Sequence, residues 1–259
     1  MRIVSYNILD GGTGRADLLG RVIESQKPDV VGLVEAGDAA VVATLANRLG
    51  MDFIQAEGNK NGSASALLSR FPIRHSINHA PQHPALTKSL LEAAVVDACG
   101  NEWTLGILHL HAHASETDED VREREAAQVL EIFRPHREAN RPHLLMGDFN
   151  ANAPYQAIEP GLCKMSTRRE WYANGGKLPR RAIARVLDAG YRDSLRVLHP
   201  AMAETSGSFS TEFPGQRVDY IFTFGIDAAR MKQARVVYDG PARDASDHCP
   251  VFLELQESH

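Results

Sequence analysis

Two short polar segments place carboxylates beside groups that handle protons or orient water. Gly147-Asp148-Phe149-Asn150 follows an apolar run, and Ser246-Asp247-His248 lies close to the C-terminus. Carboxylate oxygens are the ligands that Mg²⁺ prefers in proteins, and histidine is the side chain whose charge changes most readily near neutral pH. This combination favours metal-assisted hydrolysis of a phosphoester bond.

Asp148 and Asn150 are two residues apart, which in an extended segment turns both side chains to one face and Phe149 toward the core. The carboxylate can then accept or direct a proton of an attacking water, and the neutral amide can orient that water without adding repulsive charge. We interpret both residues as catalytic. A purely structural turn after Gly147 is the alternative.

Asp247 and His248 are adjacent, so in an extended segment their side chains point to opposite sides and we do not expect them to pair. His248 then needs another carboxylate to orient it, and Asp219, inside the apolar run 217–222, is the best candidate. A negative charge beside the imidazole would raise its pKa and suit it to stabilise a phosphoryl oxygen. A buried Asp–His pair with a structural role is the alternative.

Three further polar residues lie at the ends of apolar runs: Asn7, Glu35 and His109. An ionised Glu35 directly after Val30–Val34 is costly unless it is paired or binds a metal, although it could also begin a helix. We expect His109 to donate a hydrogen bond to a phosphoryl oxygen. His109, His111 and His113 alternate, so a transition-metal site is an alternative, but the carboxylate and amide set favours Mg²⁺ or Mn²⁺.

The segment 164–185 is basic, with seven basic residues against one acidic residue and hence a net charge of +6. Within it, Arg168, Arg169, Trp171 and Tyr172 are candidate substrate-binding residues, because aromatic rings stack on bases while cations contact phosphates. A solvated helix anchored by Trp171 is the alternative.

Hydrophobic periodicity predicts many short strands and a few helices. The predicted strands are 2–7, 29–35, 52–55, 65–69, 73–78, 89–97, 103–109, 143–147, 217–224 and 251–255, and the predicted helices are 16–26, 38–49, 117–137 and 181–187. We expect the acidic run 118–120 to be a solvated first helical turn. Because hairpins outnumber βαβ units, we expect an α/β protein with two mostly antiparallel sheets packed face to face and helices outside.

The composition is that of a globular domain. The 259 residues are 43% hydrophobic and 24% charged, and neither a repeat nor a Pro/Gly-rich linker divides them, so we expect a single domain over 1–259. Three widely spaced cysteines without a CxxC motif, no secretory signal and no transmembrane segment predict a cytoplasmic protein, which we expect to be a monomer. The net charge of −5 argues against a wide basic surface for duplex nucleic acid.

Taken in chain order, the motifs resemble those of the endonuclease/exonuclease/phosphatase superfamily, the DNase I-like metal-dependent phosphoesterases, and the chain looks like a bacterial-type single-domain member. The resemblance covers nearly the whole chain. It rests on Ser5-Tyr6-Asn7, Val34-Glu35, Leu68-Ser69-Arg70-Phe71-Pro72-Ile73, His109-Leu110, Gly147-Asp148-Phe149-Asn150, Val218-Asp219-Tyr220-Ile221 and Ser246-Asp247-His248.

This resemblance implies a four-layer α/β sandwich and Mg²⁺- or Mn²⁺-dependent cleavage of a phosphoester. Some DNA-repair members have an acidic residue at the position of Leu9, so the chain resembles that branch less. The implied roles are metal binding by Glu35, Asn7 and Asp247, positioning or activation of water by Asp148 and Asn150, orientation of His248 by Asp219, and phosphate contacts by His248 and His109.

The superfamily includes nucleases, inositol-phosphate phosphatases, sphingomyelinases and tyrosyl-DNA phosphodiesterases. We therefore expect a divalent-metal-dependent phosphohydrolase whose substrate is a phosphoester, a phosphodiester before a monoester. A DNA or RNA nuclease, or a DNA-end-processing phosphodiesterase, is the alternative within the same chemistry. A catalytically silent binding module is the alternative from another class, but the full set of motif residues is present. No HExxH or GxSxG motif supports a zinc or serine hydrolase.

Overall fold

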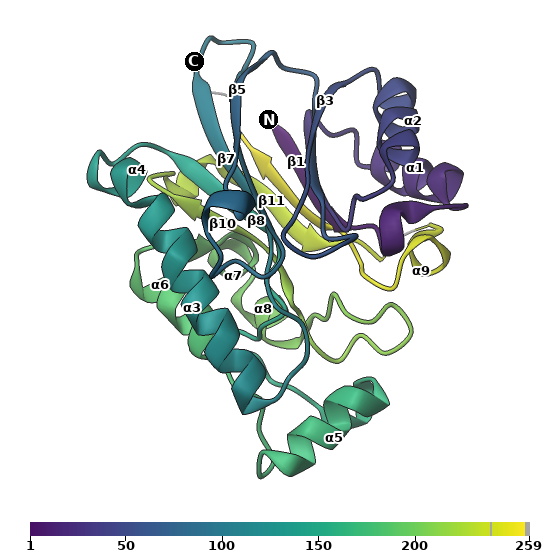
Figure 1. The fold of residues 1–259 in the computed structure, drawn as a ribbon, viewed down its shortest axis with the longest axis vertical. Helices are drawn as coiled ribbons and strands as arrows, with labels where there is room; N and C mark the ends of the chain where they lie inside the picture. The colour runs from purple at the N-terminus through teal and green to yellow at the C-terminus, as the bar shows by residue number, and fades with distance from the viewer. Residues whose placement is uncertain (239, 257–259) are drawn as a thin grey trace.

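Alternating apolar side chains build two six-stranded sheets in the computed structural model, which describes residues 1–238 and 240–256 (Figure 1). The strands of sheet A, in spatial order, are β11 (Met231–Val236), β12 (Val251–Leu255), β1 (Arg2–Asn7), β2 (Val30–Val34), β4 (Ser65–Ser69) and β3 (Asp52–Ala56). The strands of sheet B are β5 (Ile73–Asn78), β6 (Ser89–Val96), β7 (Glu102–His109), β8 (His143–Asp148), β10 (Asp219–Phe224) and β9 (Arg192–Asp193).

Each sheet has one parallel pair of strands at its centre. β1 and β2 are parallel and are joined through α1 (Ala16–Ser25), and β7 and β8 are parallel and are joined through α3 (Glu116–Ile132) and α4 (Arg134–Glu138). The other neighbouring strands are antiparallel. Parallel neighbours need a crossover, so each central pair places a helix on the outside of its sheet.

The two sheets bury a shared core between them. Ile3, Ile107 and Met146 belong to this core together with residues of both sheets. Gly32 of β2 lets the sheets approach closely, since a Cβ built there would lie 2.8 Å from Met146 Cε. Close approach matters because side chains at the ends of the two inner faces can then touch.

Helices cover the outer faces of both sheets. α1 and α2 (Ala39–Leu49) share a core with the outer side of sheet A, and α3 and α6 (Arg181–Asp188) share another with the outer side of sheet B. Figure 1 shows the order helices, sheet A, sheet B, helices. The predicted four-layer sandwich is confirmed.

The start and end of α2 follow the predicted signals. Asp38 caps the helix by accepting hydrogen bonds from Ala40 N (3.0 Å) and Val41 N (3.3 Å), and Gly50 ends it in the left-handed region with φ 61°. The predicted helix 117–137 is instead divided into α3 and α4, where Phe133 leaves the helical conformation and Pro135 follows.

The acidic run at the start of α3 was predicted to be solvated, and this is wrong for Glu119. Its side chain is fully buried and accepts hydrogen bonds from Arg122 Nε (2.8 Å) and Ala182 N (2.8 Å) at the start of α6. Packing of α6 on α3 therefore decides the environment of this carboxylate. The prediction also missed β11, an edge strand whose Lys232 and Gln233 are exposed.

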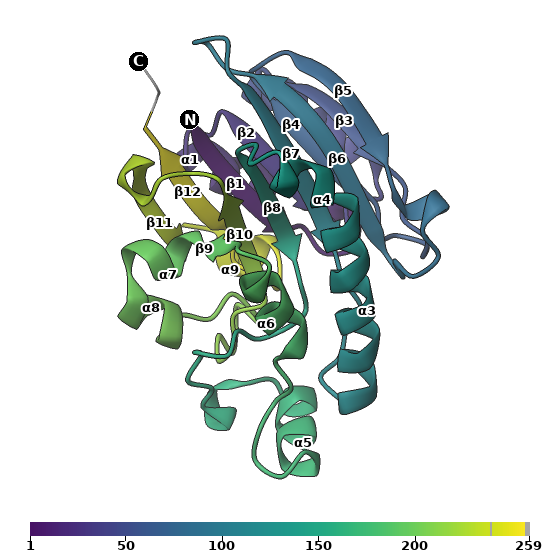
Figure 2. The ribbon, with the colours of Figure 1, turned by 90° about the vertical axis from the view of Figure 1, so that its left-hand side faces the viewer.

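The remaining helices are short, and all of them except η1 and η2 follow β8 in the chain. One of them, α5, projects from one end of the sandwich (Figure 1; Figure 2). Among the described residues, no helix is both long and apolar enough to cross a membrane. These helices are η1 (Asp10–Gly12), η2 (Ala80–Gln82), η3 (Pro160–Leu162), α5 (Met165–Ala173), α7 (Ser194–Leu198), α8 (Pro200–Thr205), η4 (Ala228–Arg230) and α9 (Ala242–Ala245).

Gly147 permits the tightest backbone approach in sheet B. Its φ is 140°, and an added Cβ would lie 1.9 Å from Leu108 O, so we expect Gly147→Ala to lower the free energy of unfolding by about 3 kcal/mol. Gly100 is the matched control, because its φ is 85° but a Cβ there meets nothing within 4 Å. Gly100→Ala should cost about 1 kcal/mol. Equal losses in urea titrations would contradict this account.

Candidate active site

Each of four strands has a polar residue at one terminus, and its side chain points between the two sheets, as the core side chains of that strand do. Asn7 comes from β1, and His109, Asp148 and Asp219 come from β7, β8 and β10. Each is at most 2% exposed. Asp148 is the cross-strand partner of both His109 and Asp219. Because strand residues alternate in direction, the inner faces of the two sheets end in one polar cluster.

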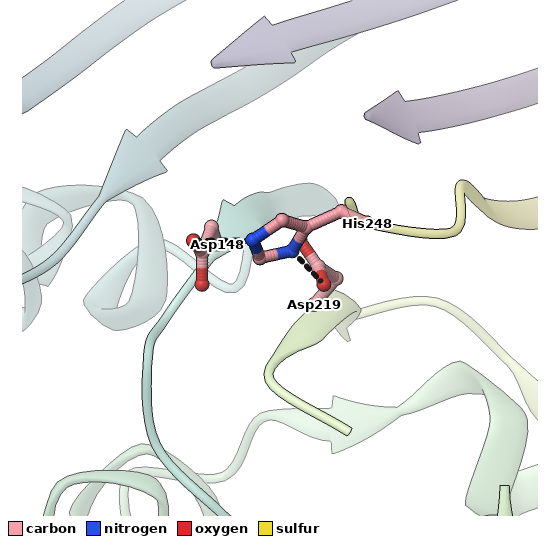
Figure 3. Close-up of side chains that lie close together, drawn as sticks. All are labelled: Asp148, Asp219 and His248. Atoms are coloured by element: carbon pink, nitrogen blue, oxygen red, sulfur yellow. Dashed lines mark hydrogen bonds and ion pairs between the residues drawn. The ribbon is translucent and has the colours of Figure 1, made fainter. Parts of the chain in front are cut away.

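Asp219 and His248 form the predicted pair. His248 Nδ1 lies 2.8 Å from Asp219 Oδ2, and the opposite ring nitrogen, Nε2, lies 3.7 Å from Asp148 Oδ2 (Figure 3). Ser246 fixes the segment, since its Oγ donates to Asn7 O (2.7 Å) and accepts from His248 N (3.3 Å). Asp247 Oδ1 lies 3.9 Å from His248 Nε2, which is beyond hydrogen-bond distance.

The protonation states of Asp219 and His248 follow from their burial and from the charged groups close to them. Burial opposes protonation of His248, but Asp219 and Asp148 outweigh it and raise the pKa of His248 to about 9. Burial raises the pKa of Asp219 to about 6, although the imidazolium opposes this shift. At neutral pH, an ionised Asp219 therefore holds a protonated His248.

The side chains of Asp148 and Asn150 lie together, but through a different backbone conformation from the extended one that was predicted. The strand ends at Asp148, and Asn150 is left-handed with φ 48°, so the predicted extended segment is wrong at this residue. Asn150 N and Nδ2 donate to Asp148 Oδ1 (2.8 Å) and Oδ2 (3.2 Å), and Nδ2 also donates to Leu110 O (3.0 Å). Phe149 is buried in the outer core of sheet B, as expected.

Asp148 remains ionised although it is buried. Burial raises the pKa of this carboxyl, but the neighbouring His248, His109 and Lys88 outweigh burial and hold the pKa well below its usual range. Such a carboxylate accepts hydrogen bonds strongly but is a weak base. It is suited to direct a water molecule.

Asn7 links the acidic groups of the two sheets. Its Nδ2 donates to Asp148 Oδ2 (3.1 Å) and Glu35 Oε1 (3.3 Å), while its Oδ1 accepts from Leu9 N (3.0 Å). Glu35 follows β2 in the left-handed region, with φ 55°, and its Oε2 accepts from Asp10 N (3.0 Å). Glu35 therefore leaves the strand rather than beginning a helix.

Lys88 is a part of the site that the sequence interpretation missed. It lies directly before β6, is 9% exposed, and its Nζ hydrogen-bonds His109 Nε2. Burial lowers the pKa of His109, although Asp148 at 3.3 Å opposes this shift. Glu35 was selected because a charge at the end of an apolar strand is costly unless it is paired or binds a metal. The same reasoning would have selected Lys88.

The alternating histidines do not form one ligand set. β7 ends at His109, and His111 Nε2 lies 2.9 Å from Asp118 Oδ1, while His113 is left-handed with φ 73°. In the part of the chain that the structure describes, the only cluster with metal-ligand spacing is Asp148, Asp219 and His248. The transition-metal alternative thus has no geometric support.

A cavity of about 490 Å³ opens over the cluster. Glu35, Lys88, His109, Asp148 and His248 line it, together with Asn150 and Asp247. Asn7 and Asp219 are buried beneath these residues. A further part of the cavity wall is formed by Lys164 and by the α5 residues Ser166, Thr167 and Glu170.

The four candidate substrate-binding residues of the basic segment lie away from this wall. Arg168 Nε donates to Cys163 O (3.0 Å) and thereby closes the loop before α5. Arg169 and Tyr172 are exposed on the other side of the helix, and Trp171 is half-buried. Arg181 and Arg185 form ion pairs with carboxylates of α3, so much of the positive charge is balanced within the chain.

The oxygen atoms at the cavity fit a hard divalent cation. Within the described chain, Asp247 Oδ1 is buried without a hydrogen-bond partner, and Glu35 is 23% exposed toward the cavity. Asp148, Asp219 and His248 offer atoms within 4.8 Å of one another, but a protonated His248 tied to Asp219 is a poor ligand. Glu35 and Asp247 Oδ1 offer carboxylate oxygens at the cavity that could take up a divalent cation.

Glu125 of α3 positions the two basic residues of the site. It is fully buried and accepts hydrogen bonds from Thr87 N (2.8 Å), Thr87 Oγ1 (2.6 Å) and His111 N (2.7 Å). These contacts fix the backbone directly before Lys88 and shortly after His109. No prediction was made for Glu125 from the sequence.

We expect Glu125→Gln to lower the free energy of unfolding by about 2 kcal/mol and kcat by about tenfold, because the amide cannot accept all three hydrogen bonds. Glu123→Gln is the control, since Glu123 lies on α3 but pairs with Arg181 and Arg185 at the surface. It should cost less than about 1 kcal/mol. Urea unfolding and steady-state kinetics test both changes, and equal effects of the two variants would disprove the positioning role.

Known proteins share this architecture. The model of the Endonuclease/Exonuclease/phosphatase family matches residues 4–248, whereas no curated protein matches the chain. The 3′ phosphatase NExo from Neisseria, solved with a product DNA hairpin, is 22% identical with a TM-score of 0.74, covering 99% of this chain and 100% of that chain.

Two further solved structures show the same fold. The AP endonuclease from Archaeoglobus fulgidus is 17% identical with a TM-score of 0.71, covering 98% of this chain and 99% of that chain. A humanized TDP2 of D. rerio is 20% identical with a TM-score of 0.67, covering 99% of each chain. With its family match and its cluster of acids, amides and histidines, the chain belongs to the Endonuclease/Exonuclease/phosphatase family and is a divalent-metal-dependent hydrolase of phosphoester bonds.

Proposed function

We propose that this enzyme hydrolyses phosphoester bonds at the ends of nucleic acid strands, with Mg²⁺ as its metal and Mn²⁺ as a substitute. The observation that carries the proposal is the cavity, which residues of α5 line together with the cluster of Glu35, His109, Asp148 and His248. About 490 Å³ suits one nucleotide-sized group better than a strand running through. The 3′ phosphatase and 3′–5′ exonuclease named NExo, which share the fold, support the same substrate class.

The proposed roles follow from the charges in the cluster. Asp148 and Asn150 hold and direct the attacking water, and Asn7 fixes the carboxylates of Asp148 and Glu35. His248, protonated and held by Asp219, stabilises negative charge on a phosphoryl oxygen. Lys88 and His109 contact another phosphoryl oxygen. Glu35 and Asp247 hold the metal, which when bound adds positive charge at the phosphoryl group.

The outer side of α5 offers further contacts to a strand beyond its last nucleotide. Arg169 is exposed, and Tyr172 is 73% exposed on the same helix. We propose these two as substrate-binding residues, while Arg168 and Trp171 maintain the loop and helix that carry them. An aromatic ring beside a cation suits a base and its phosphate.

We also propose a cytoplasmic monomer. The three cysteines are free in the structure, in agreement with a reducing compartment. Sedimentation of the purified protein would test the oligomeric state.

The test of substrate class uses 5′-labelled oligonucleotides that end in a 3′-phosphate or a 3′-hydroxyl, with phosphoinositide and sphingomyelin as alternatives. We expect release of phosphate or of single nucleotides, and a loss of at least about 100-fold in EDTA or in Glu35→Gln. Internal cleavage products, or turnover of lipid substrates alone, would contradict the proposal. Equal turnover in EDTA would contradict the metal requirement.

The Asp219→Asn variant distinguishes the role of His248 from the role of the metal. Without the carboxylate, His248 loses both its orientation and the charge that keeps it protonated, so kcat should fall about 100-fold or more. Affinity for Mn²⁺, measured by calorimetry, should change less than about threefold, because Asp219 is not a proposed ligand. Glu35→Gln is the opposite control and should weaken Mn²⁺ binding. Loss of Mn²⁺ affinity in Asp219→Asn would show that Asp219 holds the metal.

A further inference from the structure

One cation in the cavity comes from outside the motifs of the active site. Lys164 directly precedes α5 and lines the same cavity as Glu35 and His109. Its Nζ lies 3.0 Å from Asp247 Oδ2 and 4.3 Å from the centroid of the Phe209 ring. The Lys164 side chain is 36% exposed, so its ammonium is open to the cavity.

Arg122 and Lys88, two other cations at the cavity, are more deeply buried than Lys164 and already make contacts within the chain. Arg122 is buried and donates to Glu119 Oε2 (2.8 Å) and to the carbonyl oxygen of His111 (3.2 Å). Lys88 is buried against His109. An ammonium has three donors, and Asp247 uses one donor of Lys164, so Lys164 can bind an anion while its ion pair stays in place.

The fold holds Lys164 beside the catalytic histidine. Phe209 contacts Lys164 and also packs on the imidazole of His248, with ring centroids 4.7 Å apart. Gln216 Nε2 donates to Thr167 Oγ1 (3.3 Å), which ties the first turn of α5 to the segment that carries Phe209.

Close packing around Gly215 also holds the segment before α5 in place. A Cβ added at Gly215 would lie 2.5 Å from the backbone of Leu162, the last residue of η3, and 2.6 Å from Cys163 Sγ, directly before Lys164. Most of α5 projects from the sandwich (Figure 2), but Thr167 in its first turn is held by Gln216. Lys164 occupies a defined position rather than a mobile one.

We propose that Lys164 binds a non-bridging oxygen of the substrate's phosphoryl group and makes the enzyme prefer phosphomonoesters to phosphodiesters. This inference rests on the proposed function, in which a strand end presents either a terminal phosphate or a terminal nucleotide. A monoester carries between about 1.5 and 2 negative charges at neutral pH, whereas a diester carries one. Coulomb attraction to a fixed ammonium scales with that charge, so Lys164 favours the monoester.

The alternative is that the ion pair between Lys164 and Asp247 only attaches α5 to the sandwich. In that case, removal of the ammonium would change stability or lower both activities alike. The ratio of monoester to diester hydrolysis separates the two possibilities, because a structural contact acts equally on both substrates.

The experiment compares p-nitrophenyl phosphate with bis(p-nitrophenyl) phosphate, which share a leaving group and need no nucleic acid contact. In Lys164→Gln, we expect kcat/KM to fall roughly 10- to 100-fold for the monoester and at most about threefold for the diester. Lys164→Arg should keep the wild-type ratio. Lys177→Gln is the matched control, since Lys177 is an exposed lysine of the same segment outside the cavity lining. An unchanged ratio in Lys164→Gln overturns the proposal.

Binding of inorganic phosphate gives a second readout that does not depend on turnover. Calorimetry should show about tenfold weaker binding in Lys164→Gln than in Lys177→Gln, and urea titrations establish that both variants are folded. Equal phosphate affinity in the two variants would also overturn the proposal. If oligonucleotide ends are not cleaved but the ratio shifts as expected, the proposed function fails while the role of Lys164 stands.

Discussion

The burial of the Asp148 carboxylate between two sheets is the constraint on which the site depends. An isolated charge at that depth would take up a proton, but Asn7, Asn150, Lys88, His109 and His248 surround this one with donors and positive charge. Those groups come from segments that are far apart in the chain. The carboxylate is therefore stable only when both sheets are packed, which makes formation of the fold and formation of the site one event.

Much of this arrangement can be read from the sequence, because strands have a strict period of two. The runs ending at Asn7, His109 and Asp148, and the one beginning at Asp219, each predicted a buried strand with a polar end, and the pairing of Asp219 with His248 followed from the need to orient an imidazole. The left-handed turn at Asn150 did not follow. Its geometry depends on the carbonyl of Leu110, which belongs to another strand connection.

The sequence interpretation was weakest for charges whose partners lie far away in the chain. The basic segment 164–185 looked available to a polyanion, yet Arg181 and Arg185 pair with α3, about which their local sequence says nothing. Likewise Glu119 was predicted to lie in a solvated helical turn, but α6 buries it, and the strand connections bury Glu125, for which no prediction was made from the sequence. The local sequence shows which charged residues are present, but only the tertiary structure shows which residues they pair with.

The position of α5 has a consequence for how such an enzyme changes over time. Of its residues, only Thr167 is buried, so the helix contributes little to either core. It nevertheless lines the same cavity as the catalytic cluster. Substitutions at its exposed positions can alter which phosphoester fits at little cost to folding, while the sheet ends retain the chemistry. The sheet ends that carry the catalytic residues must therefore be retained, whereas α5 is free to differ between related enzymes.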